Sequence, residues 1–233
     1  MTYEEYEKIE RERIERNIAY IENGVKFVDL KMAYIDEGVK IGRGTVIYPC
    51  VVLEGDVTIG EDCVIGQNSK IVDSKIGDRT NIQSSVILES TVGRDTKVGP
   101  FAYLRPNSKI GDECKVGDFV EVKNSSMGDG AKASHLTYIG DSDVGCNVNP
   151  GCGVVFVNYD GSKKYRSVVE DGAFVGCNSN LVSPVHVGKG AYIAAGSTIT
   201  EDVPDGALYV ARSRGTVREG WVEKKGILKK DKK

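Results

Sequence analysis

Aliphatic residues recur every six positions through most of this 233-residue sequence. The spacing is kept in two long runs, which are Ile41, Ile47, Leu53, Ile59, Ile65 and Ile71, and then Val92, Val98, Leu104, Ile110, Val116 and Val122. A hexapeptide period is the sequence signature of a parallel β-helix, in which each hexad supplies one short strand and one turn. Three hexads close a triangular coil, so each inward aliphatic side chain should stack on its equivalent about 18 residues away.

The residues around each aliphatic position support the same fold. Small side chains stand two positions before it, as at Thr45, Val51, Val57, Cys63 and Ser69, and a glycine often follows it directly. Small side chains fit a tight interior, and glycine fits a corner where two backbones approach closely. With 28 glycines and only 7% aromatic residues, the composition favours a turn-dense, all-β protein over a helical bundle.

The period divides the chain into three parts. Residues 1–24 are predicted to form a linker helix, because Thr2 and Glu5 have capping-box spacing and Gly24 can end the helix. The apolar residues of this helix lie roughly along one face, namely Tyr6, Ile9, Ile14, Ile18 and Ile21. Residues 25–213 form a single β-helix domain with an irregular end, and residues 214–233 form a basic tail, which we interpret as solvated.

The repeat is interrupted once on a large scale. After Phe156 the period breaks for the segment "VNYDGSKKYRS" and resumes at Val169. A loop expelled from a solenoid is a common place for function, because connecting segments are exposed and free to carry reactive groups.

The overall charge and the cysteines restrict the function classes. A net charge of −3 is too small to suggest nucleic acid or a membrane surface as a partner. No apolar run is long enough to span a membrane, and "MTYEEYEKIE" lacks the apolar core of a signal peptide, so we expect a soluble cytoplasmic protein. The six cysteines form no CxxC pair and are expected to be reduced thiols, with Cys63 and Cys114 filling the core.

Five blocks of the sequence resemble a known family. They are "YIDEGVKIGRGTVIYPCVVLEG", "GPFAYLRPNSKIG", "VGDFVEVKNSSMGDGAKASHLTYIGD", "NVNPGCGVVFVNYDG" and "VGKGAYIAAGSTITEDV". They are similar to the left-handed β-helix acyltransferases, and within them to the glucosamine-1-phosphate N-acetyltransferase half of the bifunctional enzymes that make UDP-N-acetylglucosamine for cell-wall precursors. The resemblance implies a left-handed helix, a homotrimer with active sites between subunits, and acetyl-CoA as cosubstrate without a metal. It also implies that the uridylyltransferase domain is missing and that a separate uridylyltransferase could be a partner.

Acetylation of an amino sugar phosphate needs a base, a phosphate site and a group that polarises the thioester carbonyl. His135 is the natural base, because an unperturbed imidazole titrates near neutral pH and this residue stands off the inward position of its hexad. The resemblance implies that Glu121 orients it.

Arg105 and Lys123 each directly follow an inward aliphatic residue and are separated by three hexads, which is one full coil. Both cations should therefore lie one above the other and favour an anion between them.

The resemblance assigns the remaining candidate residues. Arg105 and Lys123 correspond to contacts of the sugar phosphate, Tyr138 and Asn149 to further sugar contacts, and Lys164 to a lysine that reaches the phosphate from a neighbouring subunit. The residues that match acetyl-CoA-binding positions are Cys152, Asn158, Tyr159, Cys177, Ala195 and Arg212. Cys152 and Cys177 depart from the family pattern, which usually has "GAGT" and a serine at these places. A thiol is a weaker hydrogen-bond donor than a hydroxyl, so Cys177 puts the reaction rate in doubt rather than the substrate class.

Three other functions were weighed. A zinc enzyme of the γ-carbonic-anhydrase kind needs three converging histidines, and this chain has only His135 and His186, roughly three coils apart. An acetyltransferase for another amino sugar phosphate or nucleotide-linked sugar stays open, because phosphate-binding cations do not read the stereochemistry of the sugar. A catalytically silent assembly or regulatory protein also stays open because of Cys177.

Overall fold

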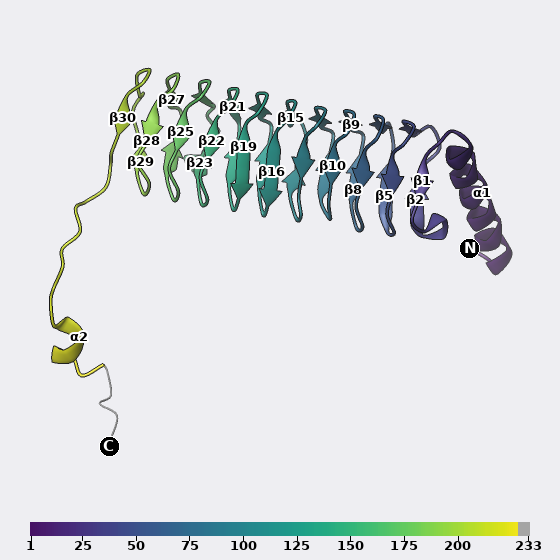
Figure 1. Ribbon diagram of the computed structural model, residues 1–233, viewed down its shortest axis with the longest axis horizontal. Helices are drawn as coiled ribbons and strands as arrows, with labels where there is room; N and C mark the ends of the chain where they lie inside the picture. The colour runs from purple at the N-terminus through teal and green to yellow at the C-terminus, as the bar shows by residue number, and fades with distance from the viewer. Residues whose placement is uncertain (228–233) are drawn as a thin grey trace.

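The computed structural model describes residues 1–227 and shows a parallel β-solenoid whose coils stack along one axis (Figure 1). Each complete coil contributes one short strand to each of three faces, and the strands of neighbouring coils pair in parallel. The parallel β-helix that the hexad period predicts is therefore confirmed.

The first face begins as a seven-stranded sheet made of β1 (Lys26–Phe27), β4 (Val46–Ile47), β7 (Val64–Ile65), β10 (Asn81–Ile82), β13 (Lys97–Val98), β16 (Lys115–Asp118) and β19 (Lys132–His135). It continues in a four-stranded sheet made of β22 (Asn149–Pro150), β25 (Phe174–Val175), β28 (Tyr192–Ile193) and β30 (Leu208–Tyr209). A backbone hydrogen bond of 2.9 Å from the Lys132 amide to the Val148 carbonyl links the two parts.

The second face is a ten-stranded sheet made of β2 (Ala33–Ile35), β5 (Val51–Glu54), β8 (Lys70–Val72), β11 (Val86–Leu88), β14 (Tyr103–Leu104), β17 (Glu121–Lys123), β20 (Tyr138–Gly140), β23 (Val155–Val157), β26 (Asn180–Val182) and β29 (Thr198–Ile199). The third face is a nine-stranded sheet made of β3 (Lys40–Ile41), β6 (Thr58–Ile59), β9 (Lys75–Ile76), β12 (Thr91–Val92), β15 (Lys109–Ile110), β18 (Ser126–Met127), β21 (Ser142–Val144), β24 (Ser167–Val169) and β27 (His186–Val187).

The core is the stack of inward side chains that the period predicts. Ile47 pairs with Ile65 in the next coil and Ile65 with Ile82 in the one after, and all three side chains are fully buried. Glycine follows many inward residues because a coil directly above leaves no room for a side chain. A methyl group built on Gly42 would lie 2.5 Å from the Gly60 carbonyl group.

The two core cysteines behave as predicted. Cys63 and Cys114 are 1% and 2% exposed, and each sulfur lies 3.1 Å from a backbone carbonyl oxygen of a neighbouring coil. Burial raises the pKa of the Cys63 thiol and raises the pKa of the Cys114 thiol to about 11. Both thiols therefore stay protonated at neutral pH.

An apolar ridge runs along the corner between the first and second faces. Phe101, Phe119 and Leu136 occupy the same corner in three successive coils, and each is more than half exposed. The rings of Phe101 and Phe119 stack with centroids 5.6 Å apart. All three residues have positive φ, a conformation that bulky side chains seldom adopt, so their place on the surface has an energetic cost.

The N-terminal helix α1 spans Tyr3–Glu22, and its Thr2–Glu5 capping box is confirmed. Its orientation differs from the apolar-face prediction, because Arg13 and Asn17 are buried while Tyr6, Ile9, Ile18 and Ile21 are exposed. The first coil has no preceding coil to donate hydrogen bonds to its carbonyl oxygens. Arg13 and Asn17 supply these donors, to the carbonyl oxygens of Lys31, Ala33 and Leu30 around the short 3₁₀ helix Leu30–Met32.

After β30 the chain leaves the solenoid, and it contains the short helix α2 (Trp221–Lys224) in the segment expected to be an irregular tail (Figure 1). The rest of the predicted basic tail, residues 228–233, lies outside the described residues. No helix among the described residues is long and apolar enough to cross a membrane.

Replacing Ile65 by alanine should lower the free energy of unfolding by about 2–5 kcal/mol, because a fully buried side chain in the stack would leave a cavity. The adjacent Val64 points outward and is only partly buried, so Val64→Ala should cost less than about 1 kcal/mol. Urea unfolding followed by circular dichroism checks both values. Equal losses for the two variants would contradict the inward assignment of Ile65.

Candidate active site

Two groups of polar residues flank the second face of the solenoid. At its corner with the first face lies a line of residues that we call the corner column, made of Asp118, His135, Cys152, Cys177, Ala195 and Arg212. At its corner with the third face lies a network that we call the acid hub, made of Lys123, Asn124, Asp141 and Asn158. The exposed side of the second face separates the two groups.

Backbone geometry places the corner column. Strands β16 and β19 pair Asp118 with His135. In each coil the residue after the column position has positive φ, namely Phe119, Leu136, Gly153, Asn178 and Gly196. The same turn therefore recurs, which sets Cys152, Cys177 and Ala195 at the corresponding corner of the next coils.

Hydrogen bonds tie the far end of the column together. The Asn178 amide donates to the Cys152 carbonyl oxygen and the Gly196 amide to the Cys177 carbonyl oxygen, both at 2.8 Å. Arg212 Nε donates to the Ala195 carbonyl oxygen at 2.8 Å. The expected base and four of the six expected cofactor residues thus share one edge of the solenoid.

The imidazole of His135 contacts a carboxylate other than the one expected. Its Nδ1 lies 2.9 Å from Asp118 Oδ1, and this hydrogen bond holds the pKa of the Asp118 carboxyl below its usual value. Glu121, the carboxylate expected to orient His135, lies on the next face and accepts a hydrogen bond from Arg105, so its orienting role stays a prediction. A carboxylate only accepts hydrogen bonds, so in neutral His135 the proton is on Nδ1 and Nε2 keeps a free lone pair.

The two predicted cations lie on neighbouring strands, as their spacing predicts. Leu104 pairs with Val122, which places Arg105 next to Lys123 at the ends of β14 and β17. Each cation has a carboxylate partner within the chain, which the sequence analysis did not predict. Arg105 donates to Glu121 at 2.9 Å, and Lys123 Nζ donates to both oxygens of Asp141 at 2.9 and 2.8 Å.

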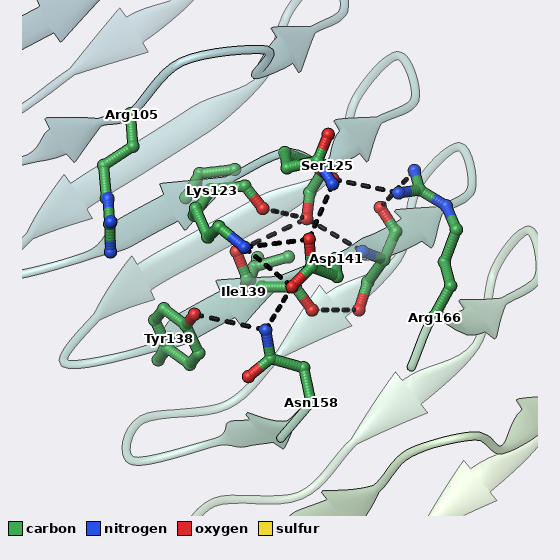
Figure 2. A network of polar contacts seen from close by, with 12 residues as sticks. Arg105, Lys123, Ser125, Tyr138, Ile139, Asp141, Asn158 and Arg166 are labelled. Atoms are coloured by element: carbon green, nitrogen blue, oxygen red, sulfur yellow. Dashed lines mark hydrogen bonds and ion pairs between the residues drawn. The ribbon is translucent and has the colours of Figure 1, made fainter. Parts of the chain in front are cut away.

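Asp141 is the centre of the acid hub (Figure 2). Its residue is only 6% exposed, and it accepts hydrogen bonds from Lys123, from Asn124 at 2.6 Å and from Asn158. Burial by itself raises the pKa of this carboxyl, but the hydrogen bonds from Asn124, Lys123 and Asn158 hold the pKa below its usual value. The carboxylate is therefore ionised at neutral pH and fixes Lys123 in place.

Of the other expected residues, only Asn158 belongs to one of the two groups. Tyr138 pairs with Glu121 on the second face, between His135 and the acid hub, and its hydroxyl lies 3.4 Å from Asn158 Nδ2. Asn158 was expected among the cofactor residues, but the structure places it in the acid hub. Asn149 lies on the first face, in β22. Tyr159 and Lys164 form an antiparallel bridge in the expelled loop, apart from the corner column.

Three residues that carry this geometry were missed by the sequence analysis, namely Asp118, Asp141 and Arg166. Arg166 ends the expelled loop and binds the Asp143 carboxylate, the Asn124 carbonyl oxygen at 2.9 Å and the Ser142 carbonyl oxygen at 3.2 Å. It lines a cavity of about 450 Å³ beside the acid hub, together with Lys109. Counting back the regular 18 residues from His135 reaches Gly117, and it is the strand register between β16 and β19 that pairs Asp118 with His135.

The described part of the chain contains no group of side chains arranged to bind a metal ion. Within residues 1–227, no group of three or more histidine, cysteine, aspartate or glutamate side chains is positioned to hold a metal ion. His186, the second histidine, instead places Nε2 3.0 Å from Glu170 Oε1.

The sequence matches known proteins along most of its length. The sequence model of the family "Bacterial transferase hexapeptide (six repeats)" matches residues 38–73, 89–124 and 166–201. The Bifunctional protein GlmU of Clostridioides difficile is 58% identical over 219 residues, which make up 94% of this chain and 47% of that protein. The chain belongs to the hexapeptide-repeat transferases.

Further relatives agree with this membership. The GlmU protein of a Geobacillus species is 56% identical to this hexapeptide-repeat transferase over 225 residues, which are 97% of this chain and 49% of that protein. The chain therefore spans about half the length of the curated relatives it matches. The solved UDP-N-acetylglucosamine acyltransferase of Arabidopsis has a TM-score of 0.52 at 18% identity, covering 88% of this chain and 77% of that one, a likeness of fold alone.

Asp141→Asn should lower the free energy of unfolding by about 1–3 kcal/mol at neutral pH, because Lys123 would lose its carboxylate partner in a largely buried place. The pKa of Asp141 is depressed on folding, so its stabilisation is present above about pH 4 and is lost as the pH falls through the folded value. The difference between wild type and variant should therefore shrink from about pH 6 to about pH 3. Thermal unfolding at several pH values checks this. A constant difference, or an equal effect of Asp56→Asn at an exposed carboxylate, would contradict the role of Asp141.

Proposed function

We propose that this chain transfers the acetyl group of acetyl-CoA to the amine of glucosamine 1-phosphate. The observation that carries the proposal is the pairing of His135 with Asp118 at one corner of the second face, with two fixed cations, Arg105 and Lys123, along its other edge. The high identity to GlmU proteins over nearly the whole chain supports it.

In the proposed reaction His135 acts as general base. Nε2 takes a proton from the acceptor amine as the nitrogen attacks the thioester carbonyl carbon, and Asp118 stabilises the imidazolium that forms. When the C–S bond breaks, the proton passes from His135 to the departing thiolate of CoA. Acetyl thus moves directly to nitrogen, and no acyl-enzyme is needed.

The acceptor would lie across the second face, along the strand direction. Its phosphate fits the edge that carries Arg105 and Lys123, whose positions are fixed by Glu121 and Asp141. The three residues of β20 cover about 7 Å, and the turn between His135 and Tyr138 adds to this length, so the sugar phosphate would span the whole exposed side of the second face. Tyr138 lies between the two and would contact the ring.

Acetyl-CoA would lie along the solenoid axis, on the corner column. Successive coils are about 4.8 Å apart, so the four steps from His135 to Arg212 cover about 19 Å. This length suits an extended pantetheine arm, with the thioester beside His135 and the phosphates near Arg212. Cys152, Cys177 and Ala195 line the path between them.

The proposed site is completed by neighbouring subunits of a homotrimer. The His135 side chain is half exposed, and His135 and its partner Asp118 directly precede Leu136 and Phe119 of the exposed ridge. An exposed apolar ridge with strained backbone is typical of a protein interface. Association through it would enclose the corner column, and would allow Lys164 of an adjacent subunit to approach the phosphate.

His135→Ala should reduce acetyl transfer roughly a hundred- to ten-thousand-fold, because the amine loses its base. Release of CoA thiol from acetyl-CoA with glucosamine 1-phosphate measures this, with glucosamine and galactosamine 1-phosphate as comparison acceptors. His186→Ala is the matched control, since His186 also pairs with a carboxylate and is equally exposed. Turnover by wild type that does not need the phosphate, or full activity of His135→Ala, would contradict the proposal.

The same assay separates the two carboxylates. Asp118→Asn should lower kcat because Asp118 orients the base, whereas Glu121→Gln should mainly raise KM for the acceptor because Glu121 holds Arg105. The reverse pattern would restore the orienting role to Glu121.

Phe119→Asn should weaken the association of subunits without unfolding the chain. Asparagine tolerates positive φ better than phenylalanine, so the coil keeps its turn while the ridge loses its central ring. Sedimentation velocity should show a trimer for wild type and smaller species for the variant. Leu208→Asn, at an exposed apolar residue outside the ridge, should leave the trimer intact. A trimer that survives Phe119→Asn would place the interface elsewhere.

A further inference from the structure

Two of the six cysteines occupy consecutive places in the corner column. β22 and β25 pair Pro150 with Val175, and two residues further on the same register aligns Cys152 with Cys177. Neighbouring strands are about 4.8 Å apart, which is inside the Cα separation of about 4.4–6.8 Å found for disulfides. The spacing alone therefore permits a bond between the two sulfurs.

Both side chains are also accessible, and the sulfur of Cys177 is directed toward the coil that carries Cys152. Cys177 is exposed and Cys152 is partly exposed. A methyl group built on Gly151 would lie 3.0 Å from Cys177 Sγ, so this sulfur leans back toward the coil that carries Cys152.

The other four cysteines differ from this pair. Cys63 and Cys114 are buried inside the solenoid, where burial raises the pKa of both thiols and disfavours the reactive thiolate. Cys50 lies several coils toward the N-terminus, and Cys146 lies at the corner between the third and first faces. The strand register and the accessibility of the side chains together thus distinguish Cys152 and Cys177 from the other four cysteines.

We propose that Cys152 and Cys177 form a reversible disulfide within the corner column, made by exchange with a low-molecular-weight disulfide. The Cys177 thiolate attacks the reagent RSSR, forming Cys177–S–S–R and releasing RS⁻. The Cys152 thiolate then attacks the Cys177 sulfur, forming the protein disulfide and releasing a second RS⁻. One RSSR is reduced to two RSH with the two thiol protons, and one protein dithiol is oxidised.

The consequence for activity rests on the proposed function. Both sulfurs lie on the path assigned to the pantetheine arm, between His135 and Ala195. A disulfide bridging two coils there would change the surface that the arm contacts, and would couple acetyl transfer to the oxidation state of the thiol pool. Reduction by a dithiol reagent would restore the two thiols and the original surface of the corner column.

Oxidised glutathione tests the bond without any assay of activity. The reduced full-length protein is incubated with it, and the products are analysed by intact mass and by non-reducing peptide mapping. We expect a loss of about 2 Da per chain, a Cys152–Cys177 linked peptide, and a fall in free thiols from six to four, since one disulfide uses two thiols.

Single substitutions identify the partners. Cys177→Ser and Cys152→Ser should each abolish the linked peptide and leave at most a glutathione adduct on the remaining thiol. Cys146→Ser and Cys50→Ser are matched controls and should still form the bond. A stable glutathione adduct on wild-type Cys177 without the loss of mass, a bond involving Cys146, or no reaction of either thiol would each overturn the proposal.

Two further arms separate this proposal from the proposed function. Acetyl-CoA should slow formation of the disulfide, and oxidation should reduce CoA release in proportion to the disulfide formed, with recovery after dithiothreitol. If the disulfide forms but acetyl-CoA does not slow its formation, the proposal of the disulfide holds and the assignment of acetyl-CoA to the corner column is wrong. If CoA release is normal in wild type and unaffected by a complete disulfide, the regulatory consequence is overturned while the proposed function stands.

Discussion

Backbone hydrogen bonds between successive coils are the constraint on which the rest of this structure depends. The Val64 amide donates to Thr80, the Asn81 amide to Thr96 and the Lys97 amide to Cys114, each to the carbonyl oxygen of the following coil. Because these bonds keep the coils in register, one position of the repeat becomes one line along the axis. The register that stacks Ile65 on Ile82 inside the solenoid also stacks Asp118 on His135 outside it.

The ends of such a stack create a different problem from its middle. Every middle coil receives hydrogen bonds from its neighbour, but the first coil has carbonyl oxygens with no preceding coil. Arg13 and Asn17 of α1 satisfy several of them, at distances of 2.7 to 3.1 Å. The need for donors outweighs the burial of the apolar face, which explains why the helix presents Ile9 and Ile18 to the surface.

Sequence patterns predicted the features that repetition imposes. The inward side chains, the break after Phe156 and the helix cap at Thr2 each leave a periodic or local signal, and the structure confirms them. For outward polar residues the period gives the position, as for Arg105 and Lys123, but not the contacts, since any hydrophilic side chain is tolerated there. Asp141 is a single acidic residue in a turn until the fold brings Lys123 and Asn158 to it from the two adjacent coils.

Glu121 and Asp118 both precede His135 by about one coil, but the corner at Phe119 separates them onto different faces. The strand register pairs Asp118 with His135 and Glu121 with Tyr138, so a resemblance read along the sequence cannot tell which carboxylate meets the imidazole.

In the proposed arrangement, the same register explains how a repetitive scaffold can have one reactive coil. The acceptor lies along the strand direction, across the second face, while the cofactor lies along the axis on the corner column. In each coil the direction of the acceptor meets the direction of the cofactor at one corner, and the geometry of this crossing is similar in every coil. Chemistry is restricted to the crossing at His135, because there the corner residue is a base held by Asp118 and the adjacent strands end in Arg105 and Lys123. The specificity of the site therefore comes from side chains at one crossing, and its precision comes from the coils that carry them.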